Sequence, residues 1–369
     1  MTAADSIADP IADKPSAAAL VAALYDDPEQ CAKVAKLRYV SPDQPGLTRL
    51  RKGKGFTYRD AKGVTVVDVE LRDRIRKIAI PPAWQQVWIA TWPDAHLLAV
   101  GEDEKGRRQY IYHERWRSIR DQLNFYRLLG FGDAMPKIRA DVDEQLRRRS
   151  FDTDRVLAAM LRIIDLAGLR VGNEVYAEEN DSYGLSTLTR KHVRVRGDSV
   201  EFDFPAKSGK QADTAIEDAG VARVVERLLT QRTRRLFTVD GEVIGSDEVN
   251  HRLSDLTGAH FTAKDFRTWK GSTVAFAYLR AHLDGRASGE NTVNAAIDAA
   301  AEKLNNTRTV CRAHYVHPDV VDGYTSGRLA EFLQGKRVRR TKWLDVDERL
   351  LLAFLAETLD ERAGNLAVM

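Results

Sequence analysis

The sequence has few of the residues that form disulfide frameworks, metal sites or membrane spans. Its 369 residues include 2 cysteines, Cys31 and Cys311, and no Cys-x-x-Cys or His-Glu-x-x-His segment. A disulfide scaffold and a standard zinc site therefore lack their usual signals. No apolar run approaches the roughly 18 residues of a membrane-spanning helix. The first residues have no cationic start followed by an apolar stretch, so we expect a cytoplasmic protein without a secretory signal.

Motifs for nucleotide chemistry are also missing, and the net charge is small. Neither Gly-x-x-x-x-Gly-Lys-Ser/Thr nor Gly-x-Gly-x-x-Gly occurs, so nucleotide hydrolysis and nicotinamide chemistry lack their signals. The net charge of +3 does not by itself indicate a nucleic-acid-binding protein. Its distribution says more, because residues 1–35 contain six acidic and two basic residues, whereas residues 36–59 contain seven basic residues and only Asp43 against them.

The composition along the chain predicts an α+β protein with four segments. Residues 1–35 are an acidic N-terminal extension, and residues 36–117 are a small β-rich domain with a basic surface. Residues 118–330 are a larger, mainly α-helical domain with a small three-stranded sheet, and residues 331–369 are a basic linker and a C-terminal helix. Alternating apolar residues in the β-rich domain predict strands at 64–69, 87–91 and 97–100.

The helical segment contains one clear helix followed by a hairpin. Asp152 is the expected N-cap of a helix whose apolar residues follow a 3.6-residue period until Gly168. Residues 192–204 then predict a β-hairpin, and a third strand is expected after the turn at residues 207–210. Lys207 should therefore lie on a tight, exposed loop.

Four polar motifs could carry chemistry, although each has an ordinary structural explanation when taken alone. Arg170 follows the apolar helix and could cap its C-terminus. Lys207 could be a solvated residue of the hairpin turn. Lys264 and Arg267, three residues apart, could form surface ion pairs on one helix face. Tyr315, flanked by histidines shortly before a proline, could be a half-buried packing residue.

In their order and spacing, the four motifs resemble the catalytic domain of type IB DNA topoisomerases, specifically the poxvirus-like bacterial branch. The resemblance covers about residues 36–330 and implies the tyrosine recombinase/topoisomerase IB-like fold, with two domains forming a clamp on DNA. It implies that Tyr315 is the nucleophile and that Lys207 is the general acid. Arg170 and Arg267 would be the phosphate clamps.

One position departs from the pattern of this family. Asn306 lies nine residues before Tyr315, where many family members have a histidine and some bacterial ones have asparagine. An amide can donate a hydrogen bond to a non-bridging phosphate oxygen but cannot carry charge. The resemblance therefore implies a catalytic role for Asn306 with one electrostatic contribution in doubt.

The resemblance also implies DNA contacts outside the catalytic set. Residues 105–112 look like the strand with which the family contacts bases and phosphates. Strand alternation would place Tyr110 and Tyr112 on one face and Gln109 on the other. Each of these residues could instead be an ordinary surface residue that makes no contact with DNA. The implied DNA-binding residues are Lys105, Arg107, Gln109, Tyr110, Tyr112, Tyr176 and Lys264.

The chemistry of phosphodiester cleavage calls for these residue types independently. Guanidinium groups neutralise the charge that develops on the phosphate, and their field favours the phenolate of a nearby tyrosine. A lysine can supply the proton that the leaving 5′ oxygen needs. The implied function is relaxation of positive and negative supercoils, independent of ATP and metal, through a 3′-phosphotyrosyl intermediate. No cofactor is expected, and the implied partner is duplex DNA, preferably supercoiled, bound by a monomer in association with the nucleoid.

Two other functions remain open at this stage. A tyrosine recombinase has a similar Arg-Lys-Arg-Tyr set, but it typically has a histidine three residues before the second arginine, where this chain has Lys264. A non-catalytic duplex-binding, architectural protein is the other alternative, and Asn306 is the sequence feature that supports it. A covalent protein–DNA adduct after denaturation in detergent would exclude the non-catalytic alternative.

Overall fold

The computed structural model describes residues 24–174, 177, 181–285 and 292–367. The chain forms two compact units, Met1–Arg127 and Leu128–Met369. Helix α4 (Glu114–Arg147) crosses the boundary between them. Within the described ranges, no helix is both long and apolar enough to cross a membrane. The domain limits predicted from sequence stay predictions.

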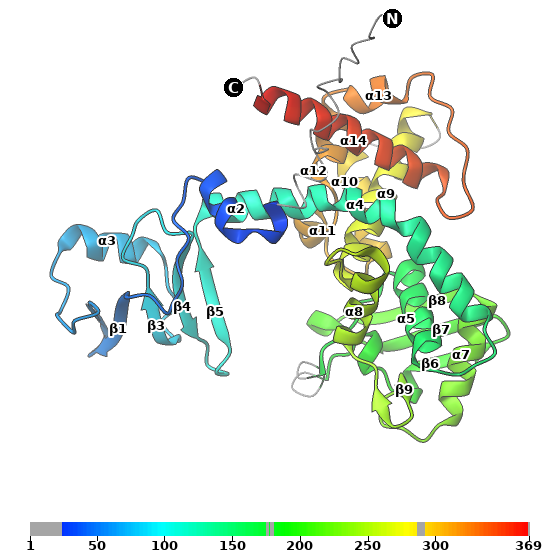
Figure 1. The fold of residues 1–369 in the computed structure, drawn as a ribbon, viewed down its shortest axis with the longest axis horizontal. Helices are drawn as coiled ribbons and strands as arrows, with labels where there is room; N and C mark the ends of the chain where they lie inside the picture. Colours follow the sequence, from blue (N-terminus) through cyan, green and yellow to red (C-terminus); the bar gives the residue numbers. More distant parts are fainter. Residues whose placement is uncertain (1–23, 175–176, 178–180, 286–291, 368–369) are drawn as a thin grey trace, which may run out of the picture. The chain divides into compact units, whose positions relative to one another are not determined.

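The first unit contains a five-stranded antiparallel sheet in the order β2-β1-β3-β4-β5 (Figure 1). Its strands are β1 (Leu47–Lys52), β2 (Gly55–Arg59), β3 (Gln85–Ile89), β4 (Leu97–Glu102) and β5 (Arg108–Tyr112). Two helices accompany the sheet, α2 (Pro28–Val34) and α3 (Val69–Lys77). The β-rich character predicted for this region is confirmed.

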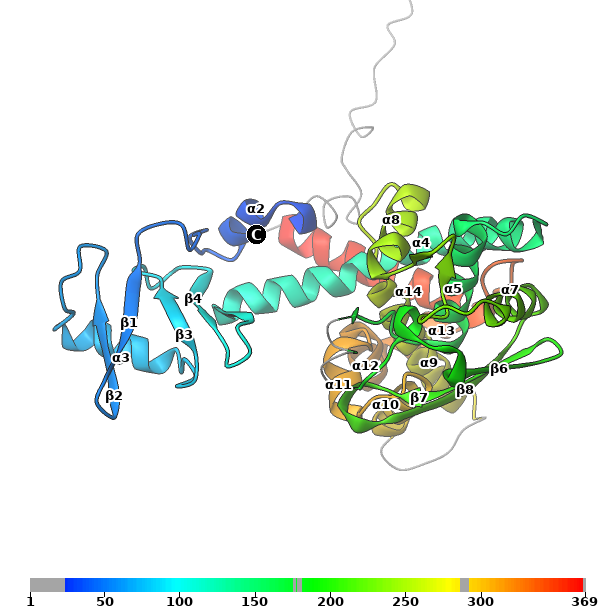
Figure 2. The same cartoon turned by 90° about the horizontal axis from the view of Figure 1, so that it is seen from below.

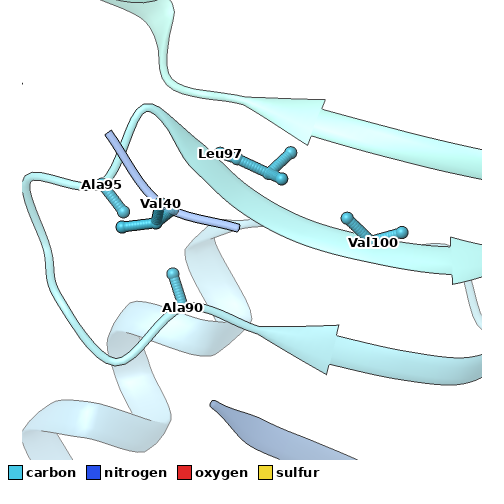
Figure 3. Packing of buried hydrophobic residues seen from close by; sticks show 5 residues of the cluster. All are labelled: Val40, Ala90, Ala95, Leu97 and Val100. Carbon is cyan, nitrogen blue, oxygen red and sulfur yellow. The ribbon is translucent and has the colours of Figure 1, made fainter. Parts of the chain in front are cut away.

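Both faces of this sheet bury apolar side chains. On one face, Ile75 of α3 packs with buried residues of β1, β3 and β4, and Ile111 of β5 lies against the same cluster. On the other face, five buried side chains form a second cluster (Figure 3). They are Val40, Ala90, Ala95, Leu97 and Val100. Tyr112 of β5 packs against this second cluster, so neighbouring residues of β5 face opposite sides of the sheet.

The strand predicted at residues 64–69 is wrong. Thr65 forms only an isolated bridge with Arg59. The carboxylate of Asp60 accepts hydrogen bonds from the backbone N–H groups of Lys62 and Val64, which folds the segment into a turn. Asp68 then caps α3, which begins at the next residue. Local hydrogen bonds from aspartate side chains therefore override the alternating pattern.

The second unit is mainly helical, and its principal sheet is antiparallel in the order β6-β7-β8. The strands are β6 (Val193–Arg196), β7 (Ser199–Pro205) and β8 (Gln211–Glu217), with a small pair β9 (Thr238–Val239) and β10 (Glu242–Val243). The three-stranded sheet and its two turns agree with the sequence prediction. Helices α5 (Thr153–Ala167) and α7 (Ala219–Thr230) pack against this sheet (Figure 2).

The remaining helices of the second unit carry or support the candidate site. They are α8 (Ser246–Thr257), α9 (Ala263–Leu283), α10 (Thr292–Lys303), α11 (Arg308–His314), α12 (Pro318–Thr325), α13 (Arg328–Leu333) and α14 (Val346–Ala367). The long helix α9 packs against α5, α10, α12 and α14. The observed fold class is α+β, as the sequence predicts.

A buried ionic network connects α14 to this helical core. The guanidinium of Arg139 in α4 bonds to Asp165 of α5 at 2.7 Å and to Glu348 of α14 at 2.7 Å. The indole N–H of Trp269 in α9 donates to the same Glu348 carboxylate at 3.0 Å. Because both carboxylates and the indole are buried, the network fixes the C-terminal helix beside α9.

Candidate active site

Arg170 lies directly after helix α5, in a segment held by backbone hydrogen bonds. Helix α5 begins at the N-cap Asp152, and its C-cap Gly168 has φ 66°, as the sequence predicts. The carbonyl of Arg170 accepts a 2.8 Å hydrogen bond from the N–H of Leu185. Gly184 approaches this segment so closely that an added Cβ atom would lie 2.9 Å from the Arg170 carbonyl oxygen. These interactions fix the backbone from which the Arg170 side chain extends.

Arg267 projects from the second turn of α9 and is almost completely buried, with 3% of its surface exposed. One Nη donates to the carbonyl of Gly168 and the other to the carbonyl of Leu304, the latter at 2.9 Å. Arg267 therefore satisfies carbonyls at the ends of two helices, a role that sequence reasoning left open for Arg170. Two of its five N–H groups make these bonds, and burial lowers the pKa of the guanidinium.

Tyr315 immediately follows α11, and its ring lies beside the guanidinium of Arg267. The Arg267 Cζ atom lies 4.8 Å from the centroid of the Tyr315 ring. The side chain of Tyr315 is half-buried and packs against Ile297, Leu304 and Cys311. The packing role considered from sequence is therefore present together with the contact to a cation.

Helix α9 also holds the backbone of Tyr315. A Cβ atom on Gly271 would lie 2.5 Å from the carbonyl oxygen of Tyr315, so the two segments are in direct contact. The hydroxyl of Ser272 donates to the same carbonyl at 3.3 Å and accepts from the N–H of His317 at 2.9 Å. Sequence reasoning missed Gly271 and Ser272. Their only signal is a pair of small residues one helical turn after Arg267.

The surroundings of Tyr315 favour its ionised form. Burial raises the pKa of the phenol, but the nearby guanidinium of Arg267 and the charges of Arg170 and Lys264 outweigh burial. The pKa of Tyr315 therefore lies below the ordinary value of a tyrosine. Cys311 lies close by, and burial raises the pKa of its thiol, which makes it a packed group and not a nucleophile.

Asn306 joins the catalytic cluster through Arg170. The Nη2 of Arg170 donates to the Asn306 Oδ1 at 3.1 Å, which fixes the orientation of the amide. The Nδ2 of Asn306 is then buried and has no hydrogen-bond acceptor among the described residues. A buried donor of this kind can bind an anionic oxygen.

The Lys207 hairpin lies against Arg170 and Asn306. Lys207 begins the short 3-10 turn η3 (Lys207–Gly209) between β7 and β8 and is exposed. With Arg170, it lines a surface hollow of about 210 Å³. A neighbouring cavity of about 340 Å³ is lined by Arg170 and Arg267. The structure thus brings together Arg170, Lys207, Arg267, Asn306 and Tyr315 in the second unit.

Comparison with known proteins identifies the family. A family model described as the catalytic core of eukaryotic DNA topoisomerase I matches residues 113–332. A model described as the N-terminal domain of bacterial DNA topoisomerase IB matches residues 55–103. DNA topoisomerase 1B of Acanthamoeba polyphaga mimivirus is 30% identical over 289 residues, which are 73% of this chain and 85% of that protein. The chain belongs to the type IB DNA topoisomerases.

Further relatives of this topoisomerase include a poxvirus protein, which agrees with the branch expected from sequence. DNA topoisomerase 1B of Vaccinia virus (strain Copenhagen) is 28% identical over 164 residues, 42% of this chain and 51% of that protein. DNA topoisomerase 1 of Candidozyma auris is 27% identical over 340 residues, 83% of this chain and 41% of that protein. A solved complex of the XerH site-specific recombinase with its palindromic difH substrate has a TM-score of 0.36 at 14% identity, over 62% of this chain and 60% of that chain.

The first unit of this topoisomerase contains most of the DNA-contacting candidates. Asp103 accepts hydrogen bonds from the side chains of Arg107 and Gln109, and from the backbone of Lys105 and Arg107. The bond from the Arg107 side chain is the main reason that the pKa of Asp103 falls to about 2. Part of the hydrogen-bonding capacity of Arg107 and Gln109 is therefore used within the turn itself.

The tyrosines of β5 take the arrangement that strand alternation predicts. The rings of Tyr110 and Tyr112 stack with centroids 6.0 Å apart and an interplanar angle of 12°. Tyr110 is 46% exposed, so its ring can contact a ligand. In the second unit, Lys264 is exposed in the first turn of α9. Tyr176 lies outside the described residues.

Proposed function

We propose that this enzyme relaxes positive and negative DNA supercoils by cutting and resealing one strand, with Tyr315 as the nucleophile. The observation that supports this most directly is the buried Arg267 guanidinium, whose Cζ atom lies 4.8 Å from the centroid of the half-buried Tyr315 ring. A cation in this position favours the phenolate and remains available to the phosphate that the phenolate attacks. Membership of the type IB family supports the same assignment.

The proposed reaction is a reversible transfer of a phosphodiester bond. The phenolate oxygen of Tyr315 attacks phosphorus, and the bond from phosphorus to the 5′ oxygen breaks. Lys207 gives that oxygen a proton, so a 5′-hydroxyl leaves and a 3′-phosphotyrosyl ester remains. Arg170, Arg267 and the Nδ2 of Asn306 stabilise the negative charge on the non-bridging oxygens. In resealing, the 5′-hydroxyl returns its proton to Lys207 and displaces the tyrosine.

This chemistry explains how the enzyme would work without ATP or a metal ion. The phosphotyrosyl ester keeps the energy of the broken bond, so resealing needs no nucleotide. Guanidinium groups supply the charge stabilisation for which other enzymes use a metal ion. While one strand is open, the duplex can rotate about the intact strand in either direction, so strain of both signs is released. We place the activity on the supercoiled DNA of the nucleoid, with the enzyme acting as a monomer.

Relaxation of plasmid DNA in EDTA and without ATP tests the proposal. Both positively and negatively supercoiled plasmids should relax, and detergent should trap nicked DNA with protein on its 3′ end. Tyr315→Phe should abolish both outcomes while leaving DNA binding nearly unchanged, because only the attacking oxygen is lost. DNA binding without relaxation or adduct in the native enzyme would instead support the architectural alternative and direct attention to Asn306.

A further inference from the structure

We propose that Lys210 is a positioning residue that fastens the Lys207 hairpin to the loop containing Asn306. This inference rests on the proposed function, because it assigns a role in the same cleavage step. The Nζ of Lys210 donates a 2.6 Å hydrogen bond to the carbonyl oxygen of Asn306, 96 residues away along the chain. Neither the motif comparison nor the strand pattern gave Lys210 a role.

A second bond joins the same two segments. The side-chain N–H of Asn305 donates to the carbonyl of Gln211 at 2.9 Å, and Gln211 is the first residue of β8. Lys210 and Gln211 thus each bond to one of two consecutive asparagines. The hairpin is itself closed by a 2.7 Å bond from the N–H of Ala206 to the carbonyl of Lys210. Lys207 therefore lies on a turn whose base is fixed on both sides.

The loop that receives Lys210 is held firmly. The N–H of Asn306 bonds to the carbonyl of Ala301 near the end of α10, at 2.8 Å. The side chain of Asn306 accepts the 3.1 Å bond from Arg170. One asparagine therefore connects a phosphate-binding arginine, through its side chain, to the hairpin of the general acid, through its carbonyl. Lys210, at the end of the hairpin turn, makes the bond that joins the hairpin to Asn306.

The bond made by Lys210 has the properties of a fastening contact. An ammonium donor forms a stronger hydrogen bond than a neutral donor, and Lys210 is only partly exposed. Lys207 is three residues away, separated by a turn in which Gly209 has φ +70°. Holding Lys210 therefore restricts where the Lys207 ammonium can lie relative to Arg170. Proton delivery to the 5′ oxygen depends on that position.

Single-turnover cleavage of two matched DNA duplexes tests this role. One duplex has an ordinary 5′ oxygen at the cleaved phosphate, and the other has sulfur in its place. A thiolate leaves without a proton, so the sulfur substrate does not require Lys207. Lys210→Met should slow cleavage of the oxygen substrate by about tenfold or more and that of the sulfur substrate by less than about threefold. Lys210→Arg, which keeps a cationic donor, should recover most of the oxygen rate.

Matched variants calibrate the result. Lys207→Ala should show the same pattern with a larger loss on oxygen, and combining it with Lys210→Met should add little further slowing, since both changes remove one function. Lys191→Met removes an exposed lysine from the turn η2 (Arg190–His192) of the same unit and should cleave both substrates at the native rate.

The outcomes separate this inference from the proposed function. Equal slowing of both substrates by Lys210→Met, or no slowing of either, overturns the positioning role. Equal slowing would make Lys210 a simple phosphate-binding cation. If the native enzyme cleaves neither substrate, the proposed function itself fails. If the native enzyme cleaves both and Lys207→Ala is rescued by sulfur, the function stands and the Lys210 result is decided independently.

Discussion

Tyr315 depends on neighbouring cations for its reactivity, because burial alone would raise the pKa of its phenol. Arg267, whose guanidinium lies 4.8 Å from the ring, makes the largest opposing contribution. We therefore expect Arg267→Gln to raise the pKa of Tyr315 and to move the rising limb of the cleavage rate to higher pH. At neutral pH the rate should fall by about 10²–10³-fold, as when one donor to a developing charge is removed. A pH profile of single-turnover cleavage measures both effects.

Lys264 provides the control for this pH profile. It is exposed, and its charge lowers the pKa of Tyr315 less than the charges of Arg267 and Arg170 do. Lys264→Gln should also move the rising limb of the cleavage rate to higher pH, but by a smaller amount. A limb that stays in place in Arg267→Gln would mean that the titrating group is not Tyr315.

Sequence reasoning identified the side chains proposed to act on the phosphate but not the residues that contact and hold them. Arg170, Lys207, Arg267 and Tyr315 were found because their order along the chain resembles a family pattern. The bond from Lys210 to Asn306 joins residues 96 apart and leaves no local pattern in the sequence. The same is true of the contact between Gly271 and Tyr315, where α9 meets the segment between α11 and α12.

At the scale of elements, helix α9 acts on Tyr315 from two successive turns. Arg267 meets the ring, and Gly271 lies against the carbonyl oxygen, where an added Cβ atom would be 2.5 Å away. Because this distance is far below van der Waals contact, Gly271→Ala must displace α9 or the Tyr315 segment. We expect a loss of about 1–3 kcal/mol in unfolding free energy and a marked fall in cleavage rate.

A second helical glycine supplies a matched comparison. Gly130 in α4 has space for a Cβ atom, which would lie 3.5 Å from the ring of Phe261. Gly130→Ala should therefore be neutral or stabilising by about 0.5–1 kcal/mol and should leave cleavage unchanged. Urea unfolding and single-turnover cleavage of both variants provide the measurement. Native cleavage by Gly271→Ala would show that this close approach does not position Tyr315.

Helix α14 is tied to the catalytic core by charge. Glu348 accepts bonds from Arg139 and from Trp269, which lies two residues after Arg267 on α9. Glu348→Ala leaves a buried guanidinium short of one carboxylate, so the unfolding free energy should fall by about 3–5 kcal/mol. Glu357→Ala, which removes the exposed ion pair with Lys336, should cost about 0–1 kcal/mol. If urea unfolding gave similar losses of unfolding free energy for the two variants, the buried network would not be what ties α14 to the core.

At the scale of the whole molecule, DNA binding should depend steeply on salt. Cations that contact phosphates displace counterions, and each contact contributes about −0.9 to the slope of log K against log salt concentration. We expect Lys105→Ala to reduce the magnitude of this slope by about 0.9. Lys77→Ala should not change it, because Lys77 ends α3, which packs on the sheet face opposite the Tyr112 ring. DNA-binding titrations at several salt concentrations measure the slope, and equal changes in both variants would remove Lys105 from the DNA contacts.

The limits of prediction are also visible at this scale. The change to a helical pattern near residue 118 correctly indicated helical structure, but the pattern did not show one long helix, nor whether that helix begins a domain or runs between two. In the structure, α4 begins at Glu114 and crosses the boundary at Leu128. Which residues pack together on either side of it depends on interactions between residues distant in sequence. Hydrophobic periodicity carries no information on those interactions.

Because the chain is synthesised from its N-terminus, the network around Glu348 is completed late. A chain made from its N-terminus contains Arg139, Asp165 and Trp269 before it contains Glu348, and the indole donates to that carboxylate. Because α9 packs against α14, we expect α9 to reach its final packing only after α14 has been made, although the proposed nucleophile Tyr315 is present earlier. If the enzyme cleaves DNA as proposed, we expect its active site to be complete only after the C-terminal helix has been translated, so unfinished chains should not cut strands.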